Sequence, residues 1–337
     1  MTEVSAFASL SPGTPLVPYS YRLGELGADE VEIAVRYCGL CYSDISMLDN
    51  SWEMSRYPLV PGHEIVGEVV AAGREVTGLT VGQRVGVGWF SGSCKACGHC
   101  GDGDENLCAQ TRSTIVGRHG GFADRVRCQA RWAVPLPDGV ELSTAGPLFC
   151  GGITVFNPII QCQVKPTERV GVVGIGGLGH LALQFLSQWG CHVVAFTSTM
   201  KKADDARRFG ADEVVTSTDV GALSALARSL DFILVTVSAS LPWDLYLNAL
   251  RAKGRLHFVG AVLEPLAIPA FALIDGQRSV MGSALGSPGT VAQMLDFCLE
   301  RDVAPAVEMY PLSRVNEAID HLRAGRARYR VVLENDL

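Results

Sequence analysis

Residues 169–179 read Arg-Val-Gly-Val-Val-Gly-Ile-Gly-Gly-Leu-Gly, a short apolar run followed directly by a glycine-rich turn. Apolar residues at helical spacing follow from His180 to Trp189, and Cys191–Phe196 forms a second apolar run. This order predicts a strand, a turn, a helix and a strand within about thirty residues, the context in which G-x-G-x-x-G binds a dinucleotide. The glycines allow the backbone to approach a pyrophosphate, and the helix N-terminus faces its charge.

The same alternation continues downstream of this glycine fingerprint. We expect strands near 213–216, 231–237 and 255–261, with helices at 220–229 and 243–252. Strands that alternate with helices predict a doubly wound parallel sheet. We therefore assign residues 148–284 to a dinucleotide-binding domain of the α/β class.

The rest of the chain, residues 1–147 and 285–337, has a different pattern. Residues 29–37 alternate apolar and polar side chains, as a half-buried strand does, and further strands are expected at 64–72 and 81–88. We therefore predict a β-rich domain shaped as a distorted barrel. Beyond residue 284 we expect helices at 288–301 and 313–324 and a last strand at 328–334.

Composition restricts the class of protein. A chain of 337 residues is long enough for about two domains, and 48% hydrophobic residues suit a large core. The net charge of −7 argues against a nucleic-acid partner. No apolar run reaches the ~18 residues of a membrane span, and the start Met1-Thr-Glu-Val does not resemble a secretory signal.

The eleven cysteines are an odd number, and six of them stand in settings typical of metal sites. This favours a reducing cytoplasm over a disulfide framework. The other five are expected to be small buried apolar residues: Cys38, Cys128, Cys162, Cys191 and Cys298.

Four cysteines fall within fifteen residues, as Cys94-x2-Cys97-x2-Cys100-x7-Cys108. This spacing suits a tetrahedral zinc site with all four positions filled by protein. The loop has little to bury, so the metal would supply its folding energy. Two disulfides or an iron–sulfur cluster are the alternatives.

A second metal site is suggested by Cys41, His63 and Cys150, which are far apart in the sequence. A Cys2His set holds a catalytic zinc and leaves one position for water or substrate. The alternative is that they are two core cysteines and one hydrogen-bonded core histidine.

Several motifs occur in one order: Cys-Gly-Leu-Cys-Tyr-Ser-Asp from 38, Pro-Gly-His-Glu from 61, the four-cysteine loop and the glycine fingerprint. With them the chain resembles the zinc-dependent medium-chain alcohol dehydrogenases. Within that family it is most similar to the cinnamyl alcohol dehydrogenase branch and to bacterial broad-range NADPH-dependent aldehyde reductases. The resemblance implies a GroES-like catalytic domain beside a Rossmann domain, two zinc ions per chain, and a homodimer joined at the edges of the nucleotide-binding sheets.

The resemblance also implies roles for residues near the catalytic zinc, which would act as a Lewis acid on an aldehyde carbonyl. Ser43 would donate the proton, and Asp44 would orient His63. Glu64 would be a fourth zinc ligand at rest, or alternatively a buried ion-pair partner. Ser46 stands where many relatives have a histidine at the outer end of a proton relay.

The turn after the second strand reads Thr-Ser-Thr-Met-Lys-Lys from 197 to 202. A carboxylate at this place binds the ribose hydroxyls of NAD(H) and would repel a 2′-phosphate, whereas hydroxyls and lysines would bind one. We therefore predict NADP(H), against the alternative of an ordinary solvated turn. The expected cofactor contacts are Gly174, Gly176, Gly177, Leu178, Gly179, Thr197, Ser198, Thr199, Lys202, Thr154, Val237, Val259, Gly260, Ser283 and Arg330.

Two tryptophans, Trp52 and Trp89, match stretches that line the substrate channel in the family, although either could be a core aromatic. A channel walled by indoles favours apolar aldehydes. Arg330 matches a position that reaches the cofactor pyrophosphate in the family, and the alternative is a surface arginine. The prediction is a reversible NADPH-dependent aldehyde reductase, and the alternatives are an NAD-dependent polyol or sugar dehydrogenase and a non-catalytic cofactor-binding relative.

Overall fold

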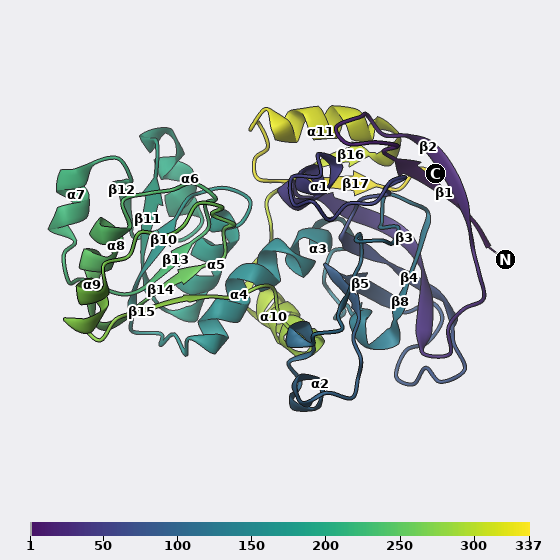
Figure 1. Cartoon of the computed structure of the whole chain (residues 1–337), viewed down its shortest axis with the longest axis horizontal. Helices are drawn as coiled ribbons and strands as arrows, with labels where there is room; N and C mark the ends of the chain where they lie inside the picture. The colour runs from purple at the N-terminus through teal and green to yellow at the C-terminus, as the bar shows by residue number, and fades with distance from the viewer. Residues whose placement is uncertain (1) are drawn as a thin grey trace. The chain divides into compact units, whose positions relative to one another are not determined.

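The computed structural model describes residues 2–337, which form two compact units. The first unit contains the chain up to Ile153 together with Gly286–Leu337, and the second contains Thr154–Leu285. Figure 1 shows a β-rich unit and a unit in which helices flank a sheet. No helix in the described residues is both long and apolar enough to cross a membrane.

The second unit is built on six parallel strands in the order β12-β11-β10-β13-β14-β15. Their bounds are β10 (Arg169–Val173), β11 (His192–Thr197), β12 (Glu213–Thr216), β13 (Leu230–Val235), β14 (Leu250–Phe258) and β15 (Ser279–Gly282). The central strands are continuous apolar runs because both faces of a parallel sheet are covered. The predicted doubly wound sheet is therefore confirmed.

Helices α4 (Gly151–Gln161), α5 (Gly179–Trp189), α6 (Ala203–Arg208), α7 (Val220–Ala225), α8 (Trp243–Ala249) and α9 (Ala270–Ile274) accompany this sheet. Helices α7 and α8 end three or four residues before the predicted ends at 229 and 252. Helix α8 ends early because Leu250 pairs with Leu230, so the residues from Leu250 onward belong to strand β14 instead of the helix. Arg228, at φ +55°, turns the chain after α7.

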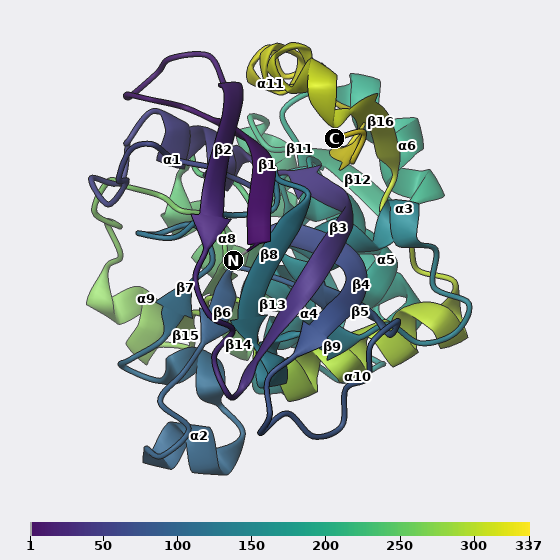
Figure 2. The ribbon, with the colours of Figure 1, turned by 90° about the vertical axis from the view of Figure 1, so that its right-hand side faces the viewer.

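The first unit contains a seven-stranded sheet with the order β16-β17-β3-β4-β5-β9, and β8 pairs with β3. The strands are β3 (Glu30–Leu40), β4 (Glu64–Ala72), β5 (Arg84–Val87), β8 (Arg125–Gln129), β9 (Val134–Pro135), β16 (Val307–Pro311) and β17 (Arg330–Glu334). Strand β3 contacts β4, β8 and β17, and its long path is visible in Figure 2. The predicted strands at 29–37, 64–72, 81–88 and 328–334 correspond to β3, β4, β5 and β17.

Two small antiparallel sheets were not predicted: β1 (Thr2–Ala8) with β2 (Val17–Leu23), and β6 (Phe90–Gly92) with β7 (Arg112–Ser113). The helices of this unit are α1 (Tyr42–Leu48), α2 (Gly98–Asp102), α3 (Leu142–Ala145), α10 (Pro288–Arg301) and α11 (Val315–Arg323). The predicted helix 288–301 coincides with α10, whose first turn is capped by the Ser287 hydroxyl.

Candidate active site

Four buried side chains of the first unit converge: Cys41, His63, Glu64 and Cys150 each place one donor atom within 4.8 Å of the others. Cys41 follows β3 and caps α1, whereas His63 and Glu64 stand where β4 begins. The antiparallel pairing of Gly39 with Glu64 brings these two strand ends together. The three residues predicted as zinc ligands therefore lie side by side, although their roles as ligands stay a prediction.

The distances between these donor atoms suit a zinc ion. The sulfur atoms of Cys41 and Cys150 are 3.9 Å apart, and His63 Nε2 is 3.3 Å from Cys150 Sγ. Atoms bound 2.0–2.3 Å from a tetrahedral zinc are roughly 3.4–3.8 Å from each other. Two thiols, an imidazole and a carboxylate are also ligand types that zinc prefers.

Asp44 orients the histidine. Its carboxylate is fully buried and accepts hydrogen bonds from the backbone N–H groups of Cys41 and Gly62, both at 2.9 Å. Its Oδ1 also lies 2.9 Å from His63 Nδ1, which therefore holds the ring proton and leaves Nε2 for a metal. This is the arrangement that the predicted role of Asp44 requires.

The electrostatics favour a charged site. Burial acts to lower the pKa of His63, but the Asp44 carboxylate outweighs it and holds that pKa well above its usual value. The Cys150 thiol, by hydrogen bonding, lowers the pKa of Cys41 well below its usual value, although burial opposes this. The same contact, together with burial, raises the pKa of Cys150.

Glu64 forms a buried ion pair with Arg330. Burial raises the pKa of Glu64 to about 7 although the Arg330 guanidinium opposes that rise. One carboxylate oxygen accepts a hydrogen bond from Arg330 Nη2, and the other, Oε2, has no hydrogen-bond partner among the described residues and is free to face a metal. The structure therefore shows the alternative role of Glu64 as a buried ion-pair partner. Its second oxygen, Oε2, remains available for the predicted role as a zinc ligand.

Arg330 is 5% exposed, so the alternative of a surface arginine was wrong. Strand β17 pairs with β3 in a register that places Val331 opposite Leu40, which brings Arg330 next to Cys41. Little in the sequence indicated that Arg330 lies next to Cys41, because β3 and β17 are separated by almost the whole chain. A contact between Arg330 and a cofactor pyrophosphate stays a prediction.

The hydroxyl predicted to donate the proton lies beside the converging donors. Ser43 Oγ in the first turn of α1 is 3.7 Å from Cys41 Sγ. Ser46 lies in the next turn and is half-buried. The far end of α1 is fixed by a bidentate contact of Arg323 with Asp49, at 2.6 and 2.7 Å. The short helix is thus held at both ends, which restricts the position of Ser43.

Two indoles stand next to the histidine. The ring of Trp89 meets the His63 imidazole edge-on with 5.0 Å between centroids, and Trp52 meets Trp89 in the same way at 5.9 Å. Both are half-buried and pack against the hydrophobic core of the first unit. They therefore have core contacts, and they also present apolar surface close to the converging donors.

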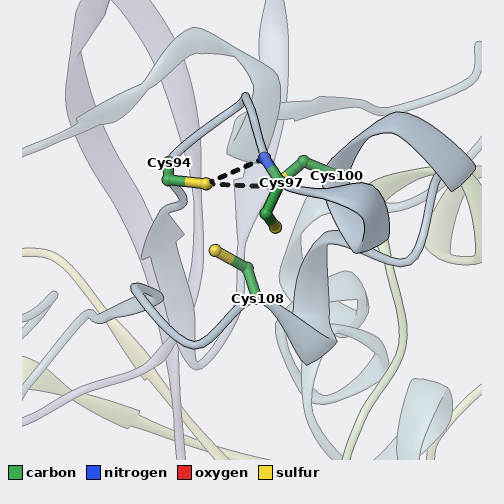
Figure 3. A group of neighbouring side chains, drawn as sticks. All are labelled: Cys94, Cys97, Cys100 and Cys108. Atoms are coloured by element: carbon green, nitrogen blue, oxygen red, sulfur yellow. Dashed lines mark hydrogen bonds between the residues drawn. The ribbon is translucent and has the colours of Figure 1, made fainter.

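The four cysteines of residues 94–108 also converge, as Figure 3 shows. Cys94 Sγ lies 3.9 Å from Cys100 Sγ and accepts backbone N–H bonds from Ala96 and Cys97 at 3.4 and 3.3 Å. The bond from Ala96 is the main reason why the pKa of Cys94 is lowered to about 6. Every cysteine in residues 2–337 is free, so the alternative of two disulfides was wrong. The other five cysteines are buried, as predicted.

In the second unit, the glycine fingerprint joins β10 to α5. A Cβ on Gly174 would lie 2.3 Å from Val237 Cγ1, and one on Gly179 would lie 1.8 Å from the Gly174 carbonyl oxygen. A Cβ on Gly176 would meet nothing within 4 Å. The first and last glycines are therefore required for packing, whereas the middle one borders open space into which a ligand could fit.

The turn after β11 exposes cationic and hydroxyl groups. Ser198 and Lys201 are exposed. Thr197 is buried and donates its hydroxyl to the Thr199 carbonyl at 3.1 Å, so its proton is already used inside the turn. Lys202 Nζ donates to the carbonyl of Ile175 at 2.8 Å, which ties the turn to the fingerprint. The turn therefore carries positive charge, and its contact with a 2′-phosphate stays a prediction.

The other predicted cofactor contacts lie at strand ends or on a helix. Val237 follows β13, Val259 and Gly260 follow β14, and Ser283 follows β15, so all are at the carboxyl edge of the sheet with the fingerprint. Ligands bind at this edge in open α/β sheets. Gly177 and Leu178 belong to the fingerprint turn, and Thr154 lies in α4.

Comparison with known proteins gives consistent results. The model "Alcohol dehydrogenase GroES-like domain" matches residues 27–138, and "Zinc-binding dehydrogenase" matches residues 177–300. "Aldehyde reductase AdhA" of a Synechocystis strain is 51% identical over 332 residues, which cover 98% of this chain and 99% of that protein.

Solved structures resemble the whole chain. A cinnamyl alcohol dehydrogenase of Sorghum bicolor has a TM-score of 0.94 at 36% identity and covers 99% of this chain and 98% of its own. The protein CAD of Helicobacter pylori, complexed with NADP(H), has a TM-score of 0.90 at 29% identity, with 98% of each chain covered.

Proposed function

The chain belongs to the zinc-dependent medium-chain alcohol dehydrogenases, in the cinnamyl alcohol dehydrogenase-like branch, and we propose that it reduces aldehydes to primary alcohols with NADPH. The reaction is reversible, so the protein is also an alcohol dehydrogenase. The observation that carries this function is the buried group Cys41, His63, Glu64 and Cys150, with Asp44 fixing the imidazole.

The proposal assigns one task to each part of the chain. Residues 148–284 would bind the dinucleotide, except for Cys150, which with residues 1–147 and 285–337 would hold two zinc ions. Cys41, His63, Cys150 and at rest Glu64 would hold the catalytic ion, and Cys94, Cys97, Cys100 and Cys108 would hold the structural one. When bound, the catalytic zinc would polarise the aldehyde carbonyl, and NADPH would supply the hydride.

The residues around this centre would orient the substrate and supply the proton. Ser43 would donate its hydroxyl proton to the substrate oxygen, since it lies beside Cys41. Ser46, one turn further along α1, would pass a proton outward through water. Arg330 would balance the charge of Glu64, and Trp52 and Trp89 would exclude water from the apolar part of the substrate.

The proposed substrate class rests on the two indoles, and the proposed cofactor rests on the turn after β11. Indoles beside the histidine favour apolar and aromatic aldehydes over sugars. Ser198, Thr199 and Lys202, with Thr197 shaping the turn, would hold the 2′-phosphate, and a relative from Helicobacter pylori is known in complex with NADP(H). Thr154, Val237, Val259, Gly260, Ser283 and Arg330 would contact other parts of the cofactor.

The proposal includes a homodimer joined through the edge strand β15. This strand pairs with β14 and with no other strand of the described residues. Phe271 and Ile274 of the neighbouring α9 are 80% and 67% exposed, and Leu263 is 76% exposed. Apolar side chains exposed beside a free strand edge support an interface.

The free cysteines support a reducing, cytoplasmic location.

The test is a panel of aliphatic, aromatic and sugar aldehydes and the matching alcohols and polyols, assayed with NADPH and with NADH. We expect aromatic aldehydes with NADPH to give the highest kcat/KM, and polyols with NAD+ to give the lowest. The reverse ranking would refute the proposed substrate class and cofactor. Light scattering of the same sample would test the dimer, which a monomeric mass would refute.

A further inference from the structure

Three polar side chains of the second unit form a chain that the proposed mechanism does not use. His257 in β14 is 1% exposed, and its Nδ1 lies 3.3 Å from the sulfur of Cys162, which follows α4. Its Nε2 lies 2.9 Å from the hydroxyl oxygen of Ser283. In the β14–β15 pair His257 stands opposite Met281, so Ser283, two residues later, falls on the same face.

Burial determines the charge states in this chain. Desolvation lowers the pKa of His257 to about 4, so the ring is neutral at physiological pH and has one N–H group. Desolvation also raises the pKa of Cys162, so the sulfur holds its proton. A neutral imidazole thus stands between a thiol and a hydroxyl, and only one of its two nitrogens donates.

The thiol selects the tautomer. A sulfur atom is a weak acceptor, whereas a bare imidazole nitrogen is a strong one. Among the described residues, the Cys162 sulfur also lies 4.0 Å from the thioether of Met281, which is again a weak acceptor. The S–H group therefore donates to Nδ1, which leaves the ring proton on Nε2. Nε2–H then donates to Ser283 Oγ, so the hydroxyl proton of Ser283 points to a different acceptor.

The position of Ser283 indicates that acceptor. The fingerprint follows β10 and the positive turn follows β11, so the adenosine half of a dinucleotide lies over that side of the sheet. Strands β13, β14 and β15 continue on the other side of β10, where the nicotinamide half would lie. Ser283 is half-buried at the carboxyl end of β15 and can present a proton to that half.

We propose that Cys162 and His257 are positioning residues that fix the Ser283 hydroxyl as a donor to an acceptor oxygen in the nicotinamide half of the bound dinucleotide. The inference rests on the proposed function in that it assumes a dinucleotide at this edge. The tautomer of His257, however, is a property of the protein alone.

The first measurement needs no ligand. The long-range 1H–15N spectrum of the full-length protein distinguishes the two neutral tautomers of His257, assigned with the His257→Gln variant. We expect Nε2 to be protonated between pH 6 and 8, and Cys162→Ala to produce a mixture of tautomers. Cys162→Ser keeps a donor and should keep the Nε2 tautomer. A protonated Nδ1 in the unaltered protein would overturn the inference.

The second measurement is the Kd of NADPH, read from its fluorescence in the same full-length protein. Ser283→Ala removes one hydrogen bond and should raise the Kd roughly two- to tenfold. His257→Leu should have the same effect, and His257→Gln, whose amide can donate from a similar place, should restore part of the affinity. The double variant His257→Leu/Ser283→Ala should bind NADPH no more weakly than Ser283→Ala alone. The control variant Cys298→Ala, which changes another buried cysteine, should not change the Kd.

The outcomes separate the two hypotheses. If the unaltered protein binds NADPH and Ser283→Ala binds it equally well, the inference is wrong and the proposed function stands. If His257→Leu weakens binding as much in the Ser283→Ala background as alone, His257 acts through general stability, and the inference is again wrong. If the unaltered protein binds neither NADPH nor NADH, the proposed function itself fails.

Discussion

Replacing Arg330 with Met should destabilise the zinc-loaded protein by an amount that depends on pH. The change removes the cation whose Nη2 donates to Glu64 and leaves a fully buried carboxylate. The unpaired carboxylate can avoid this cost by binding a proton, so the cost cannot exceed that of protonation. With Arg330 present the pKa of Glu64 is about 7, and without Arg330 each pH unit above 7 costs up to about 1.36 kcal/mol relative to the unaltered protein, so the limit is about 3 kcal/mol at pH 9.

The sign of the pH dependence follows from the same reasoning. In the variant, the folded state raises the pKa of Glu64 above its unfolded value, so the folded state holds a proton that the unfolded state has lost. The loss relative to the unaltered protein therefore grows as pH rises above about 7, and it should be below about 1 kcal/mol at pH 6. Even with Arg330 in place, burial raises the pKa of Glu64 to about 7, which supports protonation as the escape route.

Urea denaturation at pH 6 and pH 9, followed by far-UV circular dichroism and tryptophan fluorescence, measures this cost. Three of the five tryptophans, Trp52, Trp89 and Trp132, lie in the first unit, so the fluorescence reports on the unit that contains the ion pair. The variant Glu64→Gln/Arg330→Met, which removes both charges, is the control and should recover at least half of the loss at pH 9. A loss below about 1 kcal/mol at pH 9, or an equal loss at both pH values, would refute the reasoning.

Three further predictions concern catalysis, metals and cofactor. Ser43→Ala should bind zinc and NADPH normally but reduce aldehydes about 10²–10⁴-fold more slowly, and Ser46→Ala should slow the reaction less. If Ser43→Ala has a near-normal kcat while hydride transfer limits the rate, Ser43 is not part of the mechanism. Metal analysis should give two zinc ions per chain, and one zinc ion with full activity would contradict this. Cys108→Ser should lower the unfolding midpoint because its loop has little other core, whereas Cys150→Ser should stay folded but inactive. Ser198→Asp should reduce an NADPH preference of at least tenfold in kcat/KM, and an unchanged ratio of NADPH to NADH efficiency would show that the turn faces solvent.

Local patterns in the sequence determined much of this protein. The glycine fingerprint between β10 and α5 and the alternation that follows it predicted the doubly wound sheet, because both depend on residues within about thirty positions of each other. The spacing of Cys94, Cys97, Cys100 and Cys108 predicted a closed metal site for the same reason. The hairpin β1–β2, the pair β6–β7 and the ends of α7 and α8 were not predicted, because tertiary pairing sets them.

Only the tertiary structure decided how distant residues meet. The sequence could propose Cys41, His63 and Cys150 as a group by resemblance, but the pairing of β3 with β4 is what brings Cys41 to His63 and Glu64. No local pattern placed Arg330 on Glu64, because that contact depends on the register of β17 against β3 across nearly the whole chain. The chain from Cys162 through His257 to Ser283 likewise joins a helix end and two strands. Sequence periodicity records which face of an element is buried, whereas strand register, set by the sum of many weak contacts, decides which buried side chains touch.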